Sequence, residues 1–509
     1  MASTRKLGLL CIAVLAALIA YGAPTAPARA ETTVNIAVVN DFAGWNPYAD
    51  STEQMYMIWC QVYGCLGTFN TLTGEYEGML AQSWETDKSD PRIWYFHLRH
   101  GLKRQHDGKE LTAEDVVHSI DRTRNDPHTA QANNVHPIAS AEAVDKYTVK
   151  IVTKEPTAPL LSYIFDRVII TGKDLYDKYG ADADRKAPWG WGPYSLESLE
   201  IGQRMVLRKN PNWPGIKKDN PDRIIFARIK EDEARVTALL DGEVQIAMAI
   251  PPHLASRVES AKGVKAVGVP SVEDMFLGMN PKFKPWDNKK LRQAVAYAID
   301  RKAIIASIFQ GRASILDGPV GPGQYGYSPD VTPKYRYNPA KAKQLVAEAG
   351  YPNGVDVDLY TSVDRYIDDR ETSQAIAAML TKVGIRTKLH TPEYSTEWPH
   401  VRKGLVPFYY QGRGAVIDPS AALEQYFQTG VTPRIGYSNP KLDAVLLAER
   451  RTFDPAARKK LLLQAFDIIQ EDVPAFFLWR INSLYGISDK VAFQPHSDER
   501  VFGTDITVK

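Results

Sequence analysis

The sequence predicts an α/β fold with more than one domain, and three observations support this. Strand and helix patterns alternate along the chain instead of forming separate blocks. Residues 355–389 form the clearest unit: apolar residues alternate with acids at 355–359, a helical pattern spans 376–383, and alternation resumes at 385–389. We expect this unit to be a parallel, right-handed βαβ crossover. The length of 509 residues corresponds to roughly three domains, or one large body with lobes, at about 150 residues per domain.

Short strands are expected at three further places. Tyr147, Val149 and Ile151 alternate with polar residues, as a half-buried strand requires, and residues 205–207 and 224–229 are short apolar runs. No repeat, low-complexity tract or long linker interrupts the chain. We therefore expect the domains to be joined by short crossings.

Several helices carry explicit start signals. Thr112 and Asp115 have the spacing of a capping box ahead of an apolar-periodic stretch. Elsewhere a capping residue is followed by proline, which is favoured at the first helical position because it needs no hydrogen-bond acceptor there. These pairs are Asn338-Pro339, Asn439-Pro440 and Asp454-Pro455.

The first thirty residues are expected to be a signal peptide. Arg5 and Lys6 precede an uncharged apolar stretch at 7–20, and an A-x-A cleavage site ends at Ala30. The stretch is shorter than the roughly twenty residues that a membrane-spanning helix needs. We therefore expect export and cleavage between Ala30 and Glu31.

Charge and cysteine content exclude several classes of protein. Lys and Arg number 62 against 60 Asp and Glu, so no field of one sign is available to bind nucleic acid. Beyond the signal peptide the only cysteines are Cys60 and Cys65, which could pair in an oxidising compartment. A continuous helix would hold their Cα atoms too far apart, so a disulfide requires Gly64 to break the helix. A disulfide and two buried thiols both remain open.

No catalytic, cofactor or metal motif is convincing. Residues 321–326 match G-x-G-x-x-G, but surrounding prolines indicate a loop rather than the strand–helix turn that a dinucleotide site requires. His97, His100 and His106 lie close in sequence, yet His97 and His100 would point to opposite faces of a strand. We expect no enzyme activity, no cofactor and no metal site.

Several stretches resemble the extracytoplasmic solute-binding proteins of ABC importers, in the peptide/nickel/opine family (solute-binding protein family 5). Residues 80–101 resemble the pattern LA-x-x-W…F-x-L-R-x-G, and residues 190–194 resemble GTGPY with Trp191 in place of threonine. Further matches, in the same order as in the family, lie at 106–108, 111–116, 208–211, 240–244, 291–301 and 347–351. The resemblance covers essentially the whole chain after residue 30.

The resemblance implies a periplasmic-binding-protein-like clam-shell of two mixed α/β lobes with an inserted third subdomain. The first lobe would comprise 31–67, 186–278 and 481–509, the inserted subdomain 68–185, and the second lobe 279–480. Crossings near Met279-Asn280 and Leu478-Trp479 would form the hinge. The implied function is periplasmic capture of a small solute by a monomer, which delivers it to an inner-membrane ABC permease and its ATPase.

The resemblance also implies ligand-binding residues in the cleft. Peptide binders of the family carry an Asp ahead of an Asp-Pro pair and use it to bind the peptide amine; here Asp418-Pro419 is kept, but Ala415 replaces that Asp. Arg413, between Gly412 and Gly414, is instead expected to meet an anionic group with its planar fork, unless it forms an ion pair within the protein.

The remaining cleft candidates are aromatic residues and one amide. They are Trp45, Trp191, Trp398, Tyr410 and Asn280, with core packing as the alternative for the aromatic residues and strand pairing for the amide. Alternative functions are a secreted carbohydrate-active hydrolase, or a periplasmic chaperone or signalling receptor on the same fold. The identity of the solute does not follow from the sequence.

Overall fold

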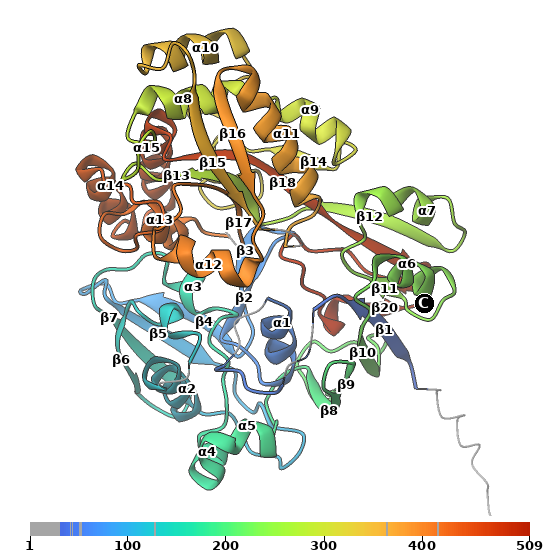
Figure 1. Ribbon diagram of the computed structural model, residues 1–509. Helices are drawn as coiled ribbons and strands as arrows, with labels where there is room; N and C mark the ends of the chain where they lie inside the picture. Colours follow the sequence, from blue (N-terminus) through green and yellow to red (C-terminus); the bar gives the residue numbers. More distant parts are fainter. Residues whose placement is uncertain are drawn as a thin grey trace, which may run out of the picture.

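A large mixed sheet runs through the computed structural model from one lobe to the other (Figure 1). The structure describes residues 31–509 except 41, 43, 50–52, 127–128, 363–364 and 415–416. The expected signal peptide with Ala30, and Ala415 in the expected cleft, lie outside the described residues. The strand order of the sheet is β16-β15-β17-β13-β18-β11-β1-β10-β9-β8, and β12 and β14 also pair with β18.

One half of this sheet belongs to the first lobe. Its strands are β1 (Thr33–Val38), β8 (Tyr194–Glu200), β9 (Arg204–Lys209), β10 (Arg223–Arg228), β11 (Ile246–Ala247) and β12 (Val264–Pro270). Helices α1 (Glu53–Val62), α6 (Asp232–Leu240) and α7 (Ala255–Glu259) accompany them, and β19 (Val491–Ala492) pairs with β20 (Thr507–Val508) near the C-terminus. The strands expected at 205–207 and 224–229 are confirmed as β9 and β10, which pair antiparallel.

The other half belongs to the second lobe. Its strands are β13 (Asp274–Met279), β14 (Ala313–Ile315), β15 (Val355–Thr361), β16 (Ile385–His390) and β17 (Phe408–Arg413). Its helices are α8 (Lys289–Ala298), α9 (Arg301–Ser307), α10 (Pro339–Glu348), α11 (Asp369–Lys382), α12 (Tyr394–Arg402), α13 (Ser420–Phe427), α14 (Pro440–Arg450) and α15 (Pro455–Asp472). The expected βαβ unit is confirmed, because β15 and β16 pair in parallel with α11 between them.

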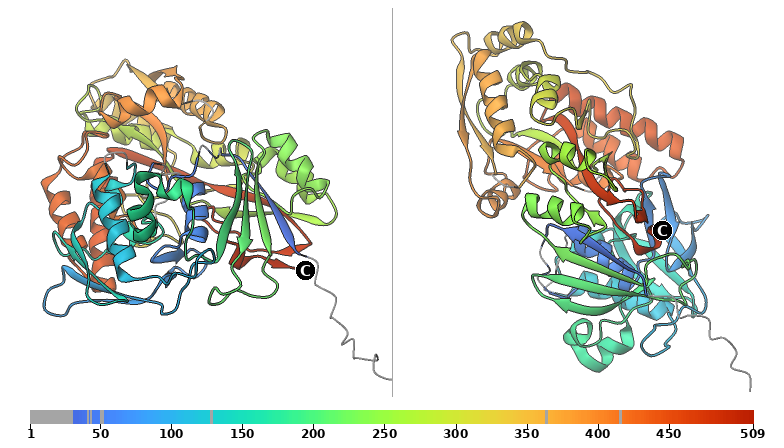
Figure 2. Two further views of the ribbon diagram at one scale, coloured as in Figure 1. Left: turned by 90° about the horizontal axis from the view of Figure 1, so that it is seen from below. Right: turned by 90° about the vertical axis from the view of Figure 1, so that its right-hand side faces the viewer.

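A third group of elements forms a subdomain with its own apolar core. It contains β2 (Gly67–Asn70), β3 (Glu75–Gly78), β4 (Ala81–Thr86), β5 (Ile93–Leu98), β6 (Ile138–Ala143) and β7 (Thr148–Thr153), with α2 (Ala113–Asn125), α3 (Leu160–Ile164), α4 (Lys173–Tyr179) and α5 (Ala183–Lys186). Strands β4-β5-β7-β6 form an antiparallel sheet. We call this group the inserted subdomain. Figure 2 shows the second lobe, yellow to orange-red, stacked on a body that holds the first lobe and the inserted subdomain. The predicted two-lobe α/β clam-shell is confirmed.

The helix start signals act as the sequence predicts. The Thr112 backbone N–H donates to Asp115 Oδ2 over 3.0 Å, which forms the capping box of α2. The Asn338 side chain accepts from the backbone N–H of Lys341 at the start of α10, and the Asp454 side chain caps α15 in the same way. These caps satisfy N–H groups that a helix leaves without partners in its first turn.

Strand β18 (Ala475–Ser488) joins the two lobes. Its first residues pair with β13, and residues 482–488 pair with β12 of the first lobe. Strand β13 also pairs with β17 along its whole length, so it lies in the second lobe's part of the sheet. This pairing places β13 beside second-lobe strands just ahead of the crossing expected near Met279-Asn280. The domain boundaries stay predictions.

Two further expectations concern segments outside the sheets. Residues 321–326 lie in turns within the long loop that separates β14 from α10, as the prolines predict, and not in a tight turn that leads directly from a strand into a helix. Within the described ranges, no helix combines the length and the apolar character needed to cross a membrane.

Candidate functional site

A cavity of about 330 Å³ lies where the inserted subdomain and the second lobe face each other. We call it the interlobe cavity. One wall comes from α1, the β2–β3 hairpin, the segment between α2 and β6, and the chain around α3: Tyr56, Phe69, Tyr76, Ala130, Asn134, Leu161, Ser162, Tyr163, Phe165, Asp166 and Arg167. The opposite wall comes from the end of β17, from α13 and from the loop after α13: Arg413, Gly414, Ile417, Asp418, Ala421, Ala422, Gln425, Tyr426 and Arg434. The lining combines aromatic rings with many polar groups, among them three arginines and two aspartates, and such polar groups orient a small molecule in its site.

Arg413 lies in this wall, but the protein already supplies a counter-charge. Its Nη2 is 3.0 Å from Oδ2 of Asp274, a fully buried residue of β13, and it also donates to the carbonyl of Pro319. Burial raises the pKa of Asp274 to about 6, although the charge of Arg413 opposes this shift. The Nε and Nη1 atoms of Arg413 have no hydrogen-bond partner among the described residues, so its expected contact with an anionic solute group stays a prediction. The internal ion pair, which was the alternative, is what the structure contains.

Asp418 also lines the cavity, and its carboxylate is held by the protein. It accepts from Arg458 Nη1 over 2.7 Å and from Nη2 over 2.8 Å, in a bidentate pair. Arg458 Nε also donates to Glu449 over 3.0 Å, and Ser420 donates to the same Glu449 over 2.7 Å. These four side chains are all buried. The geometry indicates that Asp418 anchors α13 to α15.

Arg434 differs from Arg413 because no carboxylate neutralises it. Its guanidinium carbon is 5.1 Å from the ring centre of Trp398 and 5.1 Å from that of Tyr426. Nη1 donates to the Gln425 side-chain oxygen over 3.3 Å. Among the described residues no acid lies within ion-pair distance of Arg434, which is neither fully buried nor fully exposed.

Arg167 is the cationic residue of the opposite wall. Its Nε lies 3.3 Å from Asp166 Oδ1, and its guanidinium lies over the ring of Tyr56. Asp166 also accepts from Arg500, so one carboxylate serves two arginines. Asp166 adopts φ = 51°, the left-handed region that non-glycine residues rarely occupy.

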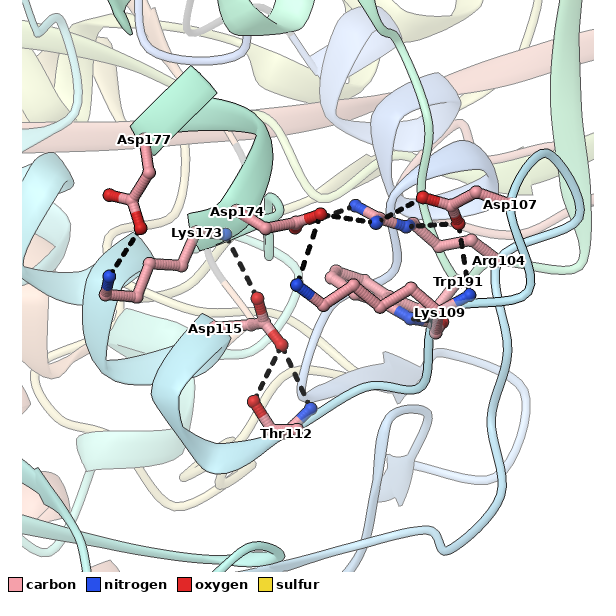
Figure 3. A network of polar contacts seen from close by, with 9 residues as sticks. All are labelled: Arg104, Asp107, Lys109, Thr112, Asp115, Lys173, Asp174, Asp177 and Trp191. Carbon is pink, nitrogen blue, oxygen red and sulfur yellow. Dashed lines mark hydrogen bonds and ion pairs between the residues drawn. The ribbon is translucent and has the colours of Figure 1, made fainter. Parts of the chain in front are cut away.

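Trp45 and Trp191, expected in the cleft, are packed inside the protein. Trp45 Nε1 donates to the Tyr63 hydroxyl over 2.7 Å. Trp191 is 1% exposed; its Nε1 donates to the Lys109 carbonyl over 3.0 Å, and Arg104 lies over its ring. Figure 3 shows this contact within a polar network that ties α4 to the loop after β5. Neither residue lines the interlobe cavity, so the alternative of core packing describes both.

The other predicted residues also lie apart from the cavity lining. Asn280 is buried and donates to the Gly404 carbonyl over 3.2 Å. Tyr410 is 2% exposed in the second lobe's core, and a side chain at Gly412 would collide with Glu273. Trp398 reaches the site indirectly, through Arg434. Of the predicted ligand residues, the structure brings Arg413, Gly414 and Asp418 together in one cavity.

The structure contains a disulfide between Cys60 and Cys65, with the Cα atoms 5.3 Å apart. Helix α1 ends at Val62, and Gly64 adopts φ = +94°. The bridge thus forms across a broken helix, as the geometric argument on Gly64 requires. Both sulfurs are in the core of the first lobe.

Sequence reasoning missed Arg434 and Arg167. Neither belongs to a motif, and each owes its place in the cavity to a loop whose course depends on tertiary contacts. The only sequence feature that could have indicated either arginine is a basic residue near aromatic residues, and this combination is common on protein surfaces. Among the residues that the structure describes, no three His, Cys, Asp or Glu side chains are grouped closely enough to hold a metal ion.

Comparisons with known proteins agree with this architecture. The family "Bacterial extracellular solute-binding proteins, family 5 Middle" matches residues 75–434. The glutathione-binding protein GsiB of Salmonella paratyphi A is 29% identical over 463 residues, which cover 88% of this chain and 89% of that protein.

Solved structures share the fold over almost the whole chain. HbpA2 from Haemophilus parasuis superposes with a TM-score of 0.83 at 24% identity, covering 94% of this chain and 100% of that one. The periplasmic binding protein DppA from Helicobacter pylori, in complex with the peptide STSA, gives a TM-score of 0.78 at 25% identity, with 94% and 98% coverage. AgaA from A. tumefaciens R10, in complex with agropinic acid, gives 0.76 at 25% identity, with 94% and 99% coverage. The chain therefore belongs to family 5 of the bacterial extracellular solute-binding proteins, the receptors that bind small solutes for ABC importers.

Proposed function

We propose that this protein captures a small peptide-like or opine-like solute in the interlobe cavity, in the periplasm, and presents it to an ABC permease and its ATPase. The observation that carries the proposal is a single cavity walled by the inserted subdomain on one side and the second lobe on the other. A solute that touches both walls stabilises the closed arrangement by its differential affinity for it. The volume of the interlobe cavity, about 330 Å³, lies at the lower end of the range for small-molecule sites, which favours a compact solute over a long peptide.

Relatives support the class of solute. One is named for glutathione binding, and solved neighbours hold a peptide or an opine-type acid, agropinic acid. All of these solutes are small and carry at least one carboxyl group. We further propose that the receptor is a monomer and is exported and cleaved after Ala30, the cleavage resting on the A-x-A site and the apolar stretch before it.

Direct contacts next to the cavity hold the two walls together. The Tyr163 hydroxyl donates to Glu424 Oε2 over 3.0 Å, and Arg451 pairs with Glu155 at 2.7 Å. Burial alone would raise the pKa of Glu424, but its contact with His136 outweighs this effect, so the pKa lies below its usual range. Glu424 is therefore ionised at neutral pH and accepts the Tyr163 hydroxyl as a charge-assisted bond.

The test is whether solute and closure are linked. Glutathione, agropinic acid and the dipeptide Met-Leu are titrated by calorimetry, and solution scattering is recorded with and without the tightest binder. We expect a smaller radius of gyration in the complex and a higher melting temperature, since 100-fold excess over Kd contributes about 2.7 kcal/mol. A bound solute that leaves the scattering envelope unchanged would refute capture between the lobes.

A matched pair of variants separates closure from general stability. Glu424→Gln removes the charge that meets Tyr163, whereas Glu75→Gln alters an exposed residue of the β2–β3 hairpin with no such contact. We expect only the first to speed solute release. Absence of turnover of a glycoside panel would at the same time separate the receptor from the hydrolase alternative.

A further inference from the structure

Arg434 lies in a loop that other parts of the second lobe hold in place. The Tyr409 hydroxyl donates to the Arg434 carbonyl over 3.4 Å, and Thr432 donates to the Gln425 carbonyl over 2.5 Å. A side-chain carbon at Gly404 would lie 2.2 Å from the Pro433 carbonyl oxygen, so only glycine allows this close approach. The loop carrying Arg434 is thus fixed before any solute arrives.

The guanidinium itself is also oriented in advance. Trp398 from α12 and Tyr426 from α13 each place a ring centre 5.1 Å from its central carbon. An arginine near two aromatic faces keeps its charge while losing few alternative side-chain conformations on binding, which lowers the entropic cost of recognition. The Gln425 amide oxygen accepts one N–H over 3.3 Å. Other donors of the planar fork remain for a solute.

The three arginines of the interlobe cavity differ in how their charges are compensated. Arg413 is paired with Asp274 at 3.0 Å, and Arg167 lies 3.3 Å from Asp166. For Arg434, no carboxylate of the described chain lies within ion-pair distance. An anionic ligand group gains most binding free energy from a cation that is partly shielded from water and that the protein does not neutralise.

We propose that Arg434 determines specificity, by binding an oxyanion of the solute, a carboxylate or a phosphate, in the interlobe cavity. Trp398 then acts as a positioning residue, because it touches the guanidinium from the far side of the cavity wall and does not line the cavity. This inference rests on the proposed function, since it assigns the chemical class of solute that the cavity takes.

The experiment first identifies the natural solute and then tests its acid group. Wild type, Arg434→Ala and Arg402→Ala are purified from the periplasm without added solute, denatured, and analysed by mass spectrometry for released small molecules. Arg402 is an exposed arginine of α12 and serves as the matched control. We expect an acidic molecule with wild type and with Arg402→Ala, and its loss from Arg434→Ala.

Calorimetry then measures the size of the effect. The released molecule, or glutathione if the protein is purified empty, is titrated as the free acid and as the ester in which every carboxyl group is converted to its ethyl ester. We expect Arg434→Ala to weaken binding of the free acid at least tenfold and to leave the ester unaffected, because the ester no longer offers an anion. Arg434→Lys should restore part of the affinity. If the solute instead presents a phosphate to Arg434, Arg434→Ala should weaken its binding equally, and esterification of its carboxyl groups should leave the affinity unchanged.

Two results would overturn the assignment. One is a solute without an acidic group that binds tightly, and the other is equal affinity of wild type and Arg434→Ala for the acid. Failure of the proposed function would give a different result from these two. A solute would then bind without any change in the scattering envelope, whether or not Arg434→Ala weakened its binding. Trp398→Leu should weaken binding of the free acid less than Arg434→Ala does, and a loss as large as that of Arg434→Ala would contradict its positioning role.

Discussion

Removing Arg458 should destabilise the second lobe more than removing either acid that it neutralises. Arg458 meets Asp418 through two hydrogen bonds of 2.7 and 2.8 Å and meets Glu449 at 3.0 Å. The side chains of the three residues are between 0% and 6% exposed, so water does not replace a lost partner. Arg458→Met leaves two buried carboxylates without a cation, and we expect a loss of about 3–5 kcal/mol in the free energy of unfolding.

Asp418→Asn is a milder perturbation because Glu449 continues to neutralise Arg458. An asparagine oxygen can keep one of the two bonds, and losing one hydrogen bond to a charged group costs about 1.5–3 kcal/mol. The expected order of stability is therefore wild type, Asp418→Asn, Arg458→Met. Urea unfolding followed by circular dichroism measures it at pH 7.

The pH dependence of the Arg458→Met variant gives a second, independent readout. Burial already raises the pKa of Glu449 and Arg458 opposes this shift, so removing the cation raises that pKa further and the folded state binds more protons than the unfolded state. The stability of the variant should then rise as pH falls from 7 towards 5, relative to wild type. A loss below about 1 kcal/mol in Arg458→Met, or a stability equal to that of Asp418→Asn, would refute the view that Asp418 is structural. A large drop in solute affinity in Asp418→Asn with unchanged stability would restore its predicted role as a ligand contact.

Three further predictions follow from the structure. Replacing both Cys60 and Cys65 by serine, or reducing wild type with dithiothreitol, should cost about 2 kcal/mol, the entropy expected for so short a loop, visible as a lower melting temperature. Burial raises the pKa of Glu273 to about 7, so its contribution to stability should be lost as pH rises through 7, and unfolding of Glu273→Gln should lack this slope between pH 5 and 8. N-terminal sequencing of the exported protein should begin at Glu31; a mature chain that still starts at Met1 would contradict the signal peptide.

Local signals explain why the secondary structure could be predicted. Asn338, with its proline and its side-chain acceptor, favours the start of a helix through residues within one helical turn, so this start can be read from a short stretch of sequence. The alternation at 355–359 likewise decides which face is buried without reference to distant residues. The family resemblance then supplied the arrangement of the lobes, which no local pattern contains.

The cavity could be predicted only in part, because its chemistry depends on pairs distant in sequence. Arg413 and Asp274 are 139 residues apart and meet because β13 and β17 are neighbours in register. Asp418 and Arg458 meet because α13 packs on α14 and α14 packs on α15, which no motif records. The same holds for Trp191, where an altered motif points to a functional residue but the ring packs beneath Arg104.

These pairs change how the ligand class should be inferred. Arg413 stands out in sequence because glycines flank it, yet the protein neutralises it, so its charge says little about the solute. Arg434 has no distinguishing sequence context, yet it carries the charge that the described residues leave without a carboxylate in the cavity wall. In a cleft where most charges have internal partners, the uncompensated charge, and not the count of charged residues, sets the preference for an anion. If Asp274→Asn, which releases Arg413 from its partner, made the cavity bind a second anionic group while Arg434 stayed in place, internal pairing would be established as the factor that limits the charge of the solute.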